Sequence, residues 1–150
     1  MTTTTMSPAL TIETETTHEA ASARAGAVSG GPRVLLRAEG ALLMIATVAA
    51  YRMLGGGWGM LAALFLVPDV SLLGYLAGPR VGAAIYNAAH STIGPALLGA
   101  LAVATGMDGT LAQLALIWAA HVGFDRMMGY GLKYATRFGA THLGQIGTKA

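Results

Sequence analysis

The sequence predicts an all-α protein: a four-helix transmembrane bundle with a disordered N-terminal tail and a short C-terminal interfacial segment. The first observation is composition, because 54% of the residues are hydrophobic, only 11% are charged and the mean hydropathy is +0.57. A soluble domain carries about 25% charged residues. The second is that four apolar stretches are each long enough to cross a hydrocarbon core of about 30 Å. The third is that short turns rich in Gly and Pro separate these stretches.

Charge and cysteine content exclude several functions. The net charge of +2 is too small for a nucleic-acid-binding surface. The chain has no cysteine, which excludes disulfides, thiolate metal sites and cysteine nucleophiles. No phosphate-binding loop, dinucleotide fingerprint or serine nucleophile elbow occurs in the sequence. We therefore expect membrane lipid and a lipophilic small molecule as partners, and no nucleic acid.

The N-terminal residues 1–32 are rich in Thr, Ala and Gly, and this composition predicts a disordered cytoplasmic tail. They contain no apolar h-region behind a basic start, so they do not resemble a secretory signal. Residues 33–150 then form the membrane domain. Its first predicted span, residues 34–54, carries Arg37 and Glu39 near its start and Arg52 near its end.

Two prolines interrupt the second and third predicted spans. The second span, residues 58–77, begins with Trp58 as an interfacial anchor and contains Pro68 beside Asp69. Because proline removes a backbone donor, we expect a kink there. The third span, residues 81–105, carries three polar side chains before a second expected kink at Pro95. These side chains are Tyr86, Asn87 and His90.

The fourth predicted span, residues 110–128, carries the densest group of polar side chains. His121 and Asp125 are four residues apart, so they share one face of a helix, and Trp118 extends the same stripe. Such a stripe on a lipid-buried helix must face protein or a water-filled cavity. Residues 129–150 contain too few apolar residues for a fifth span. We expect them to form an interfacial tail that can fold back over a cavity, bringing His142 with it.

The distribution of basic residues predicts the orientation in the membrane. With four spans, one side of the bundle collects most of them: Arg24, Arg33, Arg37, Arg80, Arg126, Lys133, Arg137 and Lys149. The opposite side has only Arg52 and Asp108. The positive-inside rule therefore predicts a multi-pass protein of the cell inner (cytoplasmic) membrane with both termini in the cytoplasm.

The polar side chains of the four spans lie at similar depths from the cytoplasmic side. At about 1.5 Å per helical residue, Glu39 lies roughly 8 Å deep, Asp69 roughly 13 Å, and Asn87 and His90 roughly 10 to 15 Å. Asp125 lies nearer the exit of the last span and His121 one turn deeper. The sequence therefore predicts a polar cavity in the cytoplasmic half of the bundle, above an apolar floor.

Three blocks of sequence resemble a known family. They are FLVPDVSLLGYLAGPRVGAAIYNAAH (residues 65–90), IWAAHVGFDRMMGYGLKY (residues 117–134) and THLGQIG (residues 141–147). Together they resemble a small bacterial four-span integral-membrane family catalogued as a domain of unknown function, over roughly residues 35–147. The resemblance implies the four-span architecture and no particular chemistry.

The first functional hypothesis is an acid–base enzyme, of isomerase or cyclase type, acting on a lipophilic, isoprenoid-like substrate without a cofactor. The predicted catalytic residues are those that exchange protons: Glu39, Asp69, His90, His121 and Asp125. The predicted substrate-binding residues surround them: Tyr75, Tyr86, Asn87, Trp118 and Arg126. Two aromatic rings, Trp118 and Tyr75, would stabilise a developing cation.

Two other functions and one structural role are alternatives. The same five ionisable residues, Glu39, Asp69, His90, His121 and Asp125, offer imidazole and carboxylate ligands suited to Fe, Mn or Zn. They also suit a proton-coupled transporter or channel, for which short spans would assemble as a homo-oligomer. In the structural alternative these groups only hold the bundle together, although intramembrane hydrogen bonds average about 0.6 kcal/mol. Arg126 would then pair with Asp125 or lipid headgroups, and Glu39 with Arg37.

Overall fold

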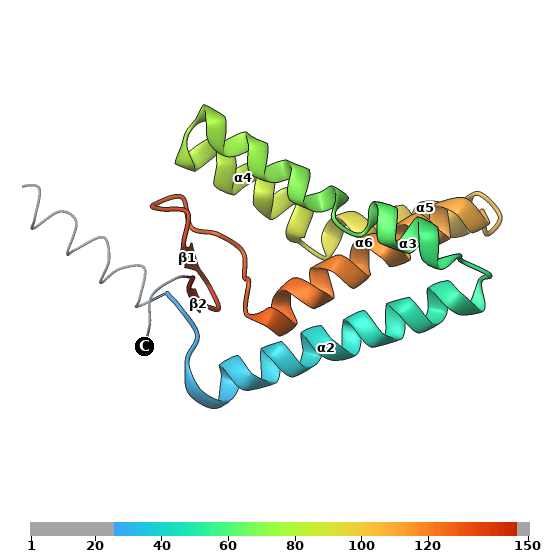
Figure 1. Cartoon of the computed structure of the whole chain (residues 1–150), viewed down its shortest axis with the longest axis horizontal. Coiled ribbons are helices and arrows are strands. Elements are labelled where there is room, and N and C mark those ends of the chain that lie inside the picture. The colour runs from blue at the N-terminus through green and yellow to red at the C-terminus, as the bar shows by residue number, and fades with distance from the viewer. Residues whose placement is uncertain (1–25, 147–150) are drawn as a thin grey trace, which may run out of the picture.

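The computed structural model describes residues 26–146, and the chain is mostly helical (Figure 1). The elements, in chain order, are α2 (Gly30–Met53), α3 (Trp58–Leu64), the 3-10 helix η1 (Val67–Ala77), α4 (Pro79–His90), α5 (Ile93–Ala104), α6 (Gly109–Met128), β1 (Ala140–Thr141) and β2 (Gly144–Gln145). The first 25 residues of the predicted tail lie outside the described residues. Residues 26–29 precede α2, which begins four residues before the predicted span.

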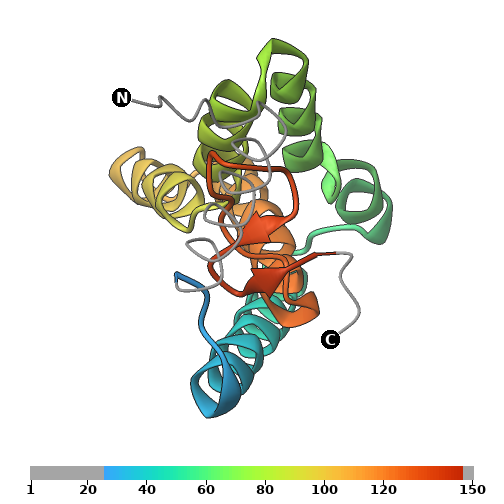
Figure 2. The ribbon, with the colours of Figure 1, turned by 90° about the vertical axis from the view of Figure 1, so that its left-hand side faces the viewer.

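The helical segments run alternately along the long axis of the molecule, so that both ends of the described chain lie at the same end (Figure 1). The first pass is α2, the second is α3 with η1, the third is α4 with α5, and the fourth is α6. Viewed along this axis, α6 lies near the centre, between α2 on one side and α4 on the other (Figure 2). These passes correspond to the predicted apolar segments.

Proline accounts for the interruptions in the second and third passes. Pro68 lies in the first turn of η1, where the α-helix gives way to a 3-10 helix. The third pass breaks between His90 and Ile93, and Pro95 follows in the first turn of α5. The break precedes Pro95 because the first turn of a helix tolerates a residue without a backbone donor. As a result, His90 is the last residue of α4 and lies beside the break.

Two glycines allow α2 and α6 to pack closely. A Cβ atom on Gly40 would lie 2.7 Å from the Met127 nitrogen, and one on Gly123 would lie 2.7 Å from the Met44 nitrogen. Both distances are too short for a carbon atom, so only glycine fits. Small residues at helix contacts are typical of membrane bundles, in which close backbone approach provides the packing energy.

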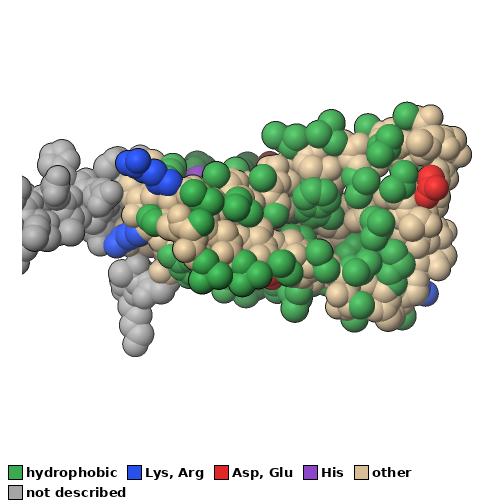
Figure 3. Space-filling model, turned by 90° about the horizontal axis from the view of Figure 1, so that it is seen from above, with side chains coloured by type: hydrophobic (Ala, Val, Ile, Leu, Met, Phe, Trp, Pro, Cys, Tyr) green, Lys and Arg blue, Asp and Glu red, His purple; other side chains and the backbone are tan. Residues whose placement is uncertain are grey.

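The outer surface of the helical segments is strongly apolar. Two segments, Gly30–Met53 and Trp58–Ala77, are long and apolar enough to cross a membrane, with mean hydropathies of 1.6 and 1.9. Large hydrophobic side chains such as Leu42, Leu76 and Leu97 are at least 66% exposed. On the face shown in Figure 3, charged side chains gather towards the two ends and the surface between them is largely hydrophobic. This is the distribution expected of a protein that lipid surrounds.

The C-terminal segment folds back over one end of the bundle. Gly129 ends α6 with a φ of 92°, a left-handed conformation that reverses the chain and that glycine adopts without strain. Strands β1 and β2 then form a short antiparallel hairpin, and Lys133 pairs with Thr141 beside it. The backbone nitrogen of Val28 donates to the His142 carbonyl at 2.8 Å, which ties the start of the described chain to the hairpin.

Candidate functional site

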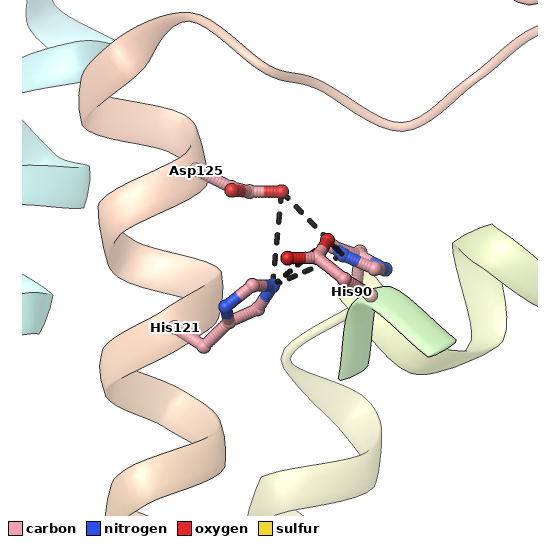
Figure 4. A group of neighbouring side chains, drawn as sticks. His90, His121 and Asp125 are labelled. Carbon is pink, nitrogen blue, oxygen red and sulfur yellow. Dashed lines mark hydrogen bonds and ion pairs between the residues drawn. The ribbon is translucent and has the colours of Figure 1, made fainter. Parts of the chain in front are cut away.

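Four ionisable side chains from three elements meet inside the bundle. Figure 4 labels three of them, His90, His121 and Asp125. Asp69 comes from η1, His90 from the end of α4, and His121 and Asp125 from one face of α6. One ligand atom from each lies within 4.8 Å of the other three. We call these four residues the His–Asp cluster. All four were predicted site residues, and the structure brings their side chains together.

The distances within the His–Asp cluster are short. The Nε2 atoms of His90 and His121 are 3.1 Å apart. The His90 Nε2 atom lies 3.3 Å from Asp69 Oδ1 and 3.5 Å from Asp125 Oδ2. The His121 Nε2 atom lies 3.7 Å and 4.0 Å from the same two oxygens. The two imidazoles are buried and the Asp69 side chain is 37% exposed, so Asp69 forms the open side.

Tyr86 holds two members of the His–Asp cluster in place. Its hydroxyl donates to Asp125 Oδ2 at 3.0 Å. Its ring stacks on the His90 imidazole, with centroids 3.7 Å apart and planes at 11°. Its backbone carbonyl lies 2.9 Å from His90 Nδ1, one turn along α4. Because a carbonyl only accepts, His90 Nδ1 carries a proton, and in the neutral imidazole Nε2 then presents a lone pair to the cluster.

This tautomer leaves the His–Asp cluster rich in acceptors. The lone pair of His90 Nε2 faces oxygens of Asp69 and Asp125, and a carboxylate is also an acceptor only. Electron pairs that converge in a buried site need a proton or a metal ion between them. His121 Nε2, at 3.1 Å, can donate a proton to His90 Nε2 in one of its tautomers, and a metal ion between the four atoms is the other solution.

Most of the donor-atom spacings are close to those around a divalent metal ion, although the whole set extends to 4.8 Å. A tetrahedral ion with ligands at about 2.0 to 2.2 Å holds its donor atoms about 3.3 to 3.6 Å apart. The five distances that involve imidazole nitrogens range from 3.1 to 4.0 Å. A metal-bound histidine usually donates its other ring N–H to a carbonyl or carboxylate, as His90 does to Tyr86. Two imidazoles and two carboxylates suit Zn²⁺, Mn²⁺ or Fe²⁺.

One cavity opens onto the His–Asp cluster and a second includes residues adjacent to it in the chain. A chamber of about 320 Å³ is lined by Asp69, His121 and Asp125, together with Tyr86 and the ammonium-bearing Lys133. A second, apolar groove of about 520 Å³ has residues next to the cluster in its wall, among them Pro68, Ala89 and Trp118. The chamber therefore gives a ligand access to the cluster, and the groove is suited to an apolar chain.

Sequence reasoning missed Lys133, which it treated only as a basic residue of the tail. The side chain is 5% exposed, and its Nζ atom donates to the Phe138 carbonyl at 3.0 Å. Burial lowers the pKa of Lys133, while the negative charges of Asp125 and Asp69 act in the opposite direction. The available signal was its position in the block GYGLKY, directly after the fourth span, where two glycines allow the chain to turn back.

The structure does not bring Glu39 or Arg126 to the His–Asp cluster. Both line a separate pocket of about 290 Å³, together with His142. The reason is the packing of α2, which contacts α6 around Gly123, and position 123 lies on the opposite side of the helix from positions 121 and 125. The predicted catalytic role of Glu39 and the predicted substrate contact of Arg126 therefore have no geometric support here.

Three other predicted substrate-binding residues make contacts within the protein. The Asn87 amide pairs with the backbone of Lys133, through Nδ2 to the carbonyl at 2.8 Å and from the backbone nitrogen to Oδ1 at 2.7 Å. The Trp118 indole donates to the Ala89 carbonyl at 2.6 Å, and its ring lines the apolar groove. The Tyr75 ring packs edge-on against Phe138, with centroids 5.0 Å apart.

Comparison with known proteins gives a family but no activity. No curated protein matches the chain, and no solved structure matches it. The profile of a family described as a domain of unknown function, DUF4260, matches residues 33–146. This range includes all four residues of the His–Asp cluster, the helices that carry them and Lys133. The chain therefore belongs to the DUF4260 family.

Proposed function

We propose that this chain is an integral membrane metalloprotein whose His–Asp cluster binds one divalent metal ion and presents it to a lipophilic substrate. The observation that carries the proposal is the convergence of two imidazole nitrogens and two carboxylate oxygens within 4.8 Å. Intramembrane carboxylates are costly and usually mark function. A site that supplies four ligands at these spacings offsets that cost by binding a cation.

The chemistry that such an ion supplies is Lewis-acid and acid–base catalysis. With Mn²⁺ or Fe²⁺, which accept more than four ligands, positions on the chamber side would stay open to a substrate. Tyr86 and Asp125 share a hydrogen bond at the chamber wall, so they can hold and return a proton. This reading retains an isomerase- or cyclase-type reaction on an isoprenoid-like substrate, now with a metal in place of a cofactor-free site.

Four membrane spans, with both termini in the cytoplasm, complete the proposal. It is supported by the two segments with mean hydropathies of 1.6 and 1.9 and by the apolar surface between the charged ends of Figure 3. The third and fourth passes lie beside these segments (Figure 2). In this arrangement the His–Asp cluster lies in the cytoplasmic half, and a lipophilic substrate enters from the inner leaflet.

A metal-free acid–base enzyme is the second candidate, and the His90–Asp69 distance of 3.3 Å favours it because these groups can share a proton directly. Proton transport has less support than either enzyme. Beyond the cluster, the described residues that line the groove are apolar apart from Ser71 and the Trp118 indole. Such a lining offers no series of proton carriers across the membrane.

Metal titration of the purified protein in a non-ionic detergent tests the proposal. We expect about one equivalent of Zn²⁺, Mn²⁺ or Fe²⁺ by elemental analysis, and loss of this binding in His121→Ala and Asp69→Asn. The matched control is Glu39→Gln, which removes a predicted ligand that lies outside the cluster and should leave binding intact. Failure of the wild-type protein to bind any of these ions at neutral pH would leave the metal-free enzyme as the better reading.

A further inference from the structure

The chamber beside the His–Asp cluster contains a buried ammonium group. Lys133 Nζ lies 3.7 Å from the ring centroid of Phe138, 4.7 Å from that of Tyr86 and 5.9 Å from that of Tyr75. Aromatic faces attract a cation through their quadrupoles, but they do not neutralise its charge. Within residues 26–146, the Lys133 ammonium donates a hydrogen bond to the Phe138 carbonyl, whereas an ammonium has three donors.

The position of Lys133 is fixed by the same helix that carries His90. Asn87 on α4 makes two hydrogen bonds to the Lys133 backbone, and Lys133 also pairs with Thr141 of the hairpin. Asn87 and His90 are three residues apart on α4, so they share a face of that helix. Lys133 is therefore held by the helix that carries His90, and it lines the same chamber as the other three residues of the His–Asp cluster.

The net charge of the chamber depends on whether a metal ion is bound. Its charged lining residues, among those described, are Lys133, Asp69 and Asp125. Without a metal, two carboxylates and one ammonium give a net charge of about −1 when all are ionised. A divalent ion neutralises the two carboxylates, and the buried ammonium is then left without a counterion in a largely apolar chamber. A buried charge without a partner is unfavourable, so the metal-loaded chamber has room for one negative charge.

We propose that the metal-loaded chamber binds the carboxylate head of an amphiphile, with one oxygen on the metal ion and the other near the Lys133 ammonium. The inference rests on the metal site of the proposed function and names its substrate class. Leu66, Leu72 and Phe124 are among the apolar residues that line the rest of the chamber. In this proposal they contact the apolar chain of the amphiphile. A volume of about 320 Å³ is at the lower end for ligand pockets, so it accommodates the head and first part of the chain.

Calorimetric titration with octanoate, in a non-ionic detergent, tests the inference. We expect octanoate to bind the Mn²⁺-loaded protein at least tenfold more tightly than the metal-free protein, and at least tenfold more tightly than octanol binds. Lys133→Met should lower octanoate affinity by at least tenfold while one equivalent of metal still binds. Lys133→Arg, which keeps the positive charge, should retain most of the affinity.

Each arm distinguishes this inference from the metal proposal. If metal binds but octanoate affinity is the same with and without it, or the same as that of octanol, the inference is wrong and the metal site stands. If octyl phosphate binds and octanoate does not, a carboxylate is the wrong head group. If no metal binds, the proposed metal site is wrong, and the inference that rests on it is wrong as well. Should Lys133→Met fail to fold, the comparison of metal-loaded and metal-free wild-type protein still decides.

Discussion

Replacing Tyr86 by phenylalanine removes one hydroxyl group from the support of the His–Asp cluster. That hydroxyl donates to Asp125 Oδ2 at 3.0 Å. The ring that stacks on His90 and the backbone carbonyl that faces His90 Nδ1 both remain in Tyr86→Phe. The change therefore tests whether orientation of the Asp125 carboxylate contributes to metal affinity, separately from the packing of the histidine.

The expected effect on metal binding is similar in size to the contribution of a hydrogen bond to folding. A hydrogen bond to a charged group contributes about 1.5 to 3 kcal/mol to folding stability. Loss of an outer partner of a metal ligand typically lowers metal affinity by about 10- to 100-fold, which corresponds to about 1.4 to 2.8 kcal/mol. We therefore expect Tyr86→Phe to weaken metal binding by 10- to 100-fold.

The assay is competition for metal against a chromophoric chelator at neutral pH, with thermal unfolding followed in parallel. Tyr75→Phe is the matched control, because within residues 26–146 its hydroxyl has no hydrogen-bond partner. It should bind metal as the wild-type protein does. A Tyr86→Phe affinity within threefold of wild type would refute the orienting role of the hydroxyl. A complete loss of metal binding together with a strongly lowered melting temperature would show that the Tyr86 hydroxyl is needed for folding.

Two further predictions concern packing and pH. Gly123→Ala places a Cβ atom 2.7 Å from the Met44 nitrogen and should lower the stability by about 1 to 3 kcal/mol in thermal unfolding. Gly99→Ala places its Cβ 3.8 Å from that of Ala115 and should change little. Burial lowers the pKa of His142 below its ordinary value of 6.5, and Arg126 adds to the shift. The folded state therefore resists protonation of His142, so hydrogen-exchange protection of residues 129–146 should fall as the pH drops below about 6.5.

The controls for these two predictions are specific. Equal melting temperatures for Gly123→Ala and Gly99→Ala would show that α2 and α6 can separate without cost. For the pH effect, His142 Nδ1 accepts from the Leu132 nitrogen at 2.8 Å, and an asparagine keeps an acceptor there without titrating. In His142→Asn the loss of protection on acidification should disappear. Persistence of the loss in that variant would assign the effect to another group.

Counting residues along the predicted spans grouped the four residues of the His–Asp cluster, although it also included Glu39. A helix advances about 1.5 Å per residue, so positions in different spans can be compared in depth, and this brought Asp69, His90 and His121 to one level. The spacing of His121 and Asp125 fixed their common face. The proline positions also indicated where the second and third passes break, with the second break before Pro95 because a first helical turn accepts proline.

The depth of a residue does not give its direction around the helix axis. For this reason Glu39 was predicted to join the catalytic residues, whereas in the structure it lines a separate pocket. Glu39 lies on α2, and α2 packs against the side of α6 that carries Gly123. The sequence pattern does not indicate on which side of α6 the helix α2 packs. Lys133 was not predicted as a site residue for a related reason. Its place in the chamber depends on the chain reversal at Gly129 and on its pairing with Asn87, which lies 46 residues away in the chain.

The irregular backbone and the ionisable side chains occur at the same places, and this coincidence argues for function over packing. Asp69 follows the proline that begins the 3-10 helix η1, and His90 ends α4 at the break before α5. Inside a membrane, non-helical backbone is tolerated only where protein or a cavity surrounds it. A bundle selected only for stability would avoid both the breaks and the charges. Their combination beside a chamber of about 320 Å³ is explained if the breaks bring η1 and the end of α4 to a metal ion that the regular helix α6 also binds.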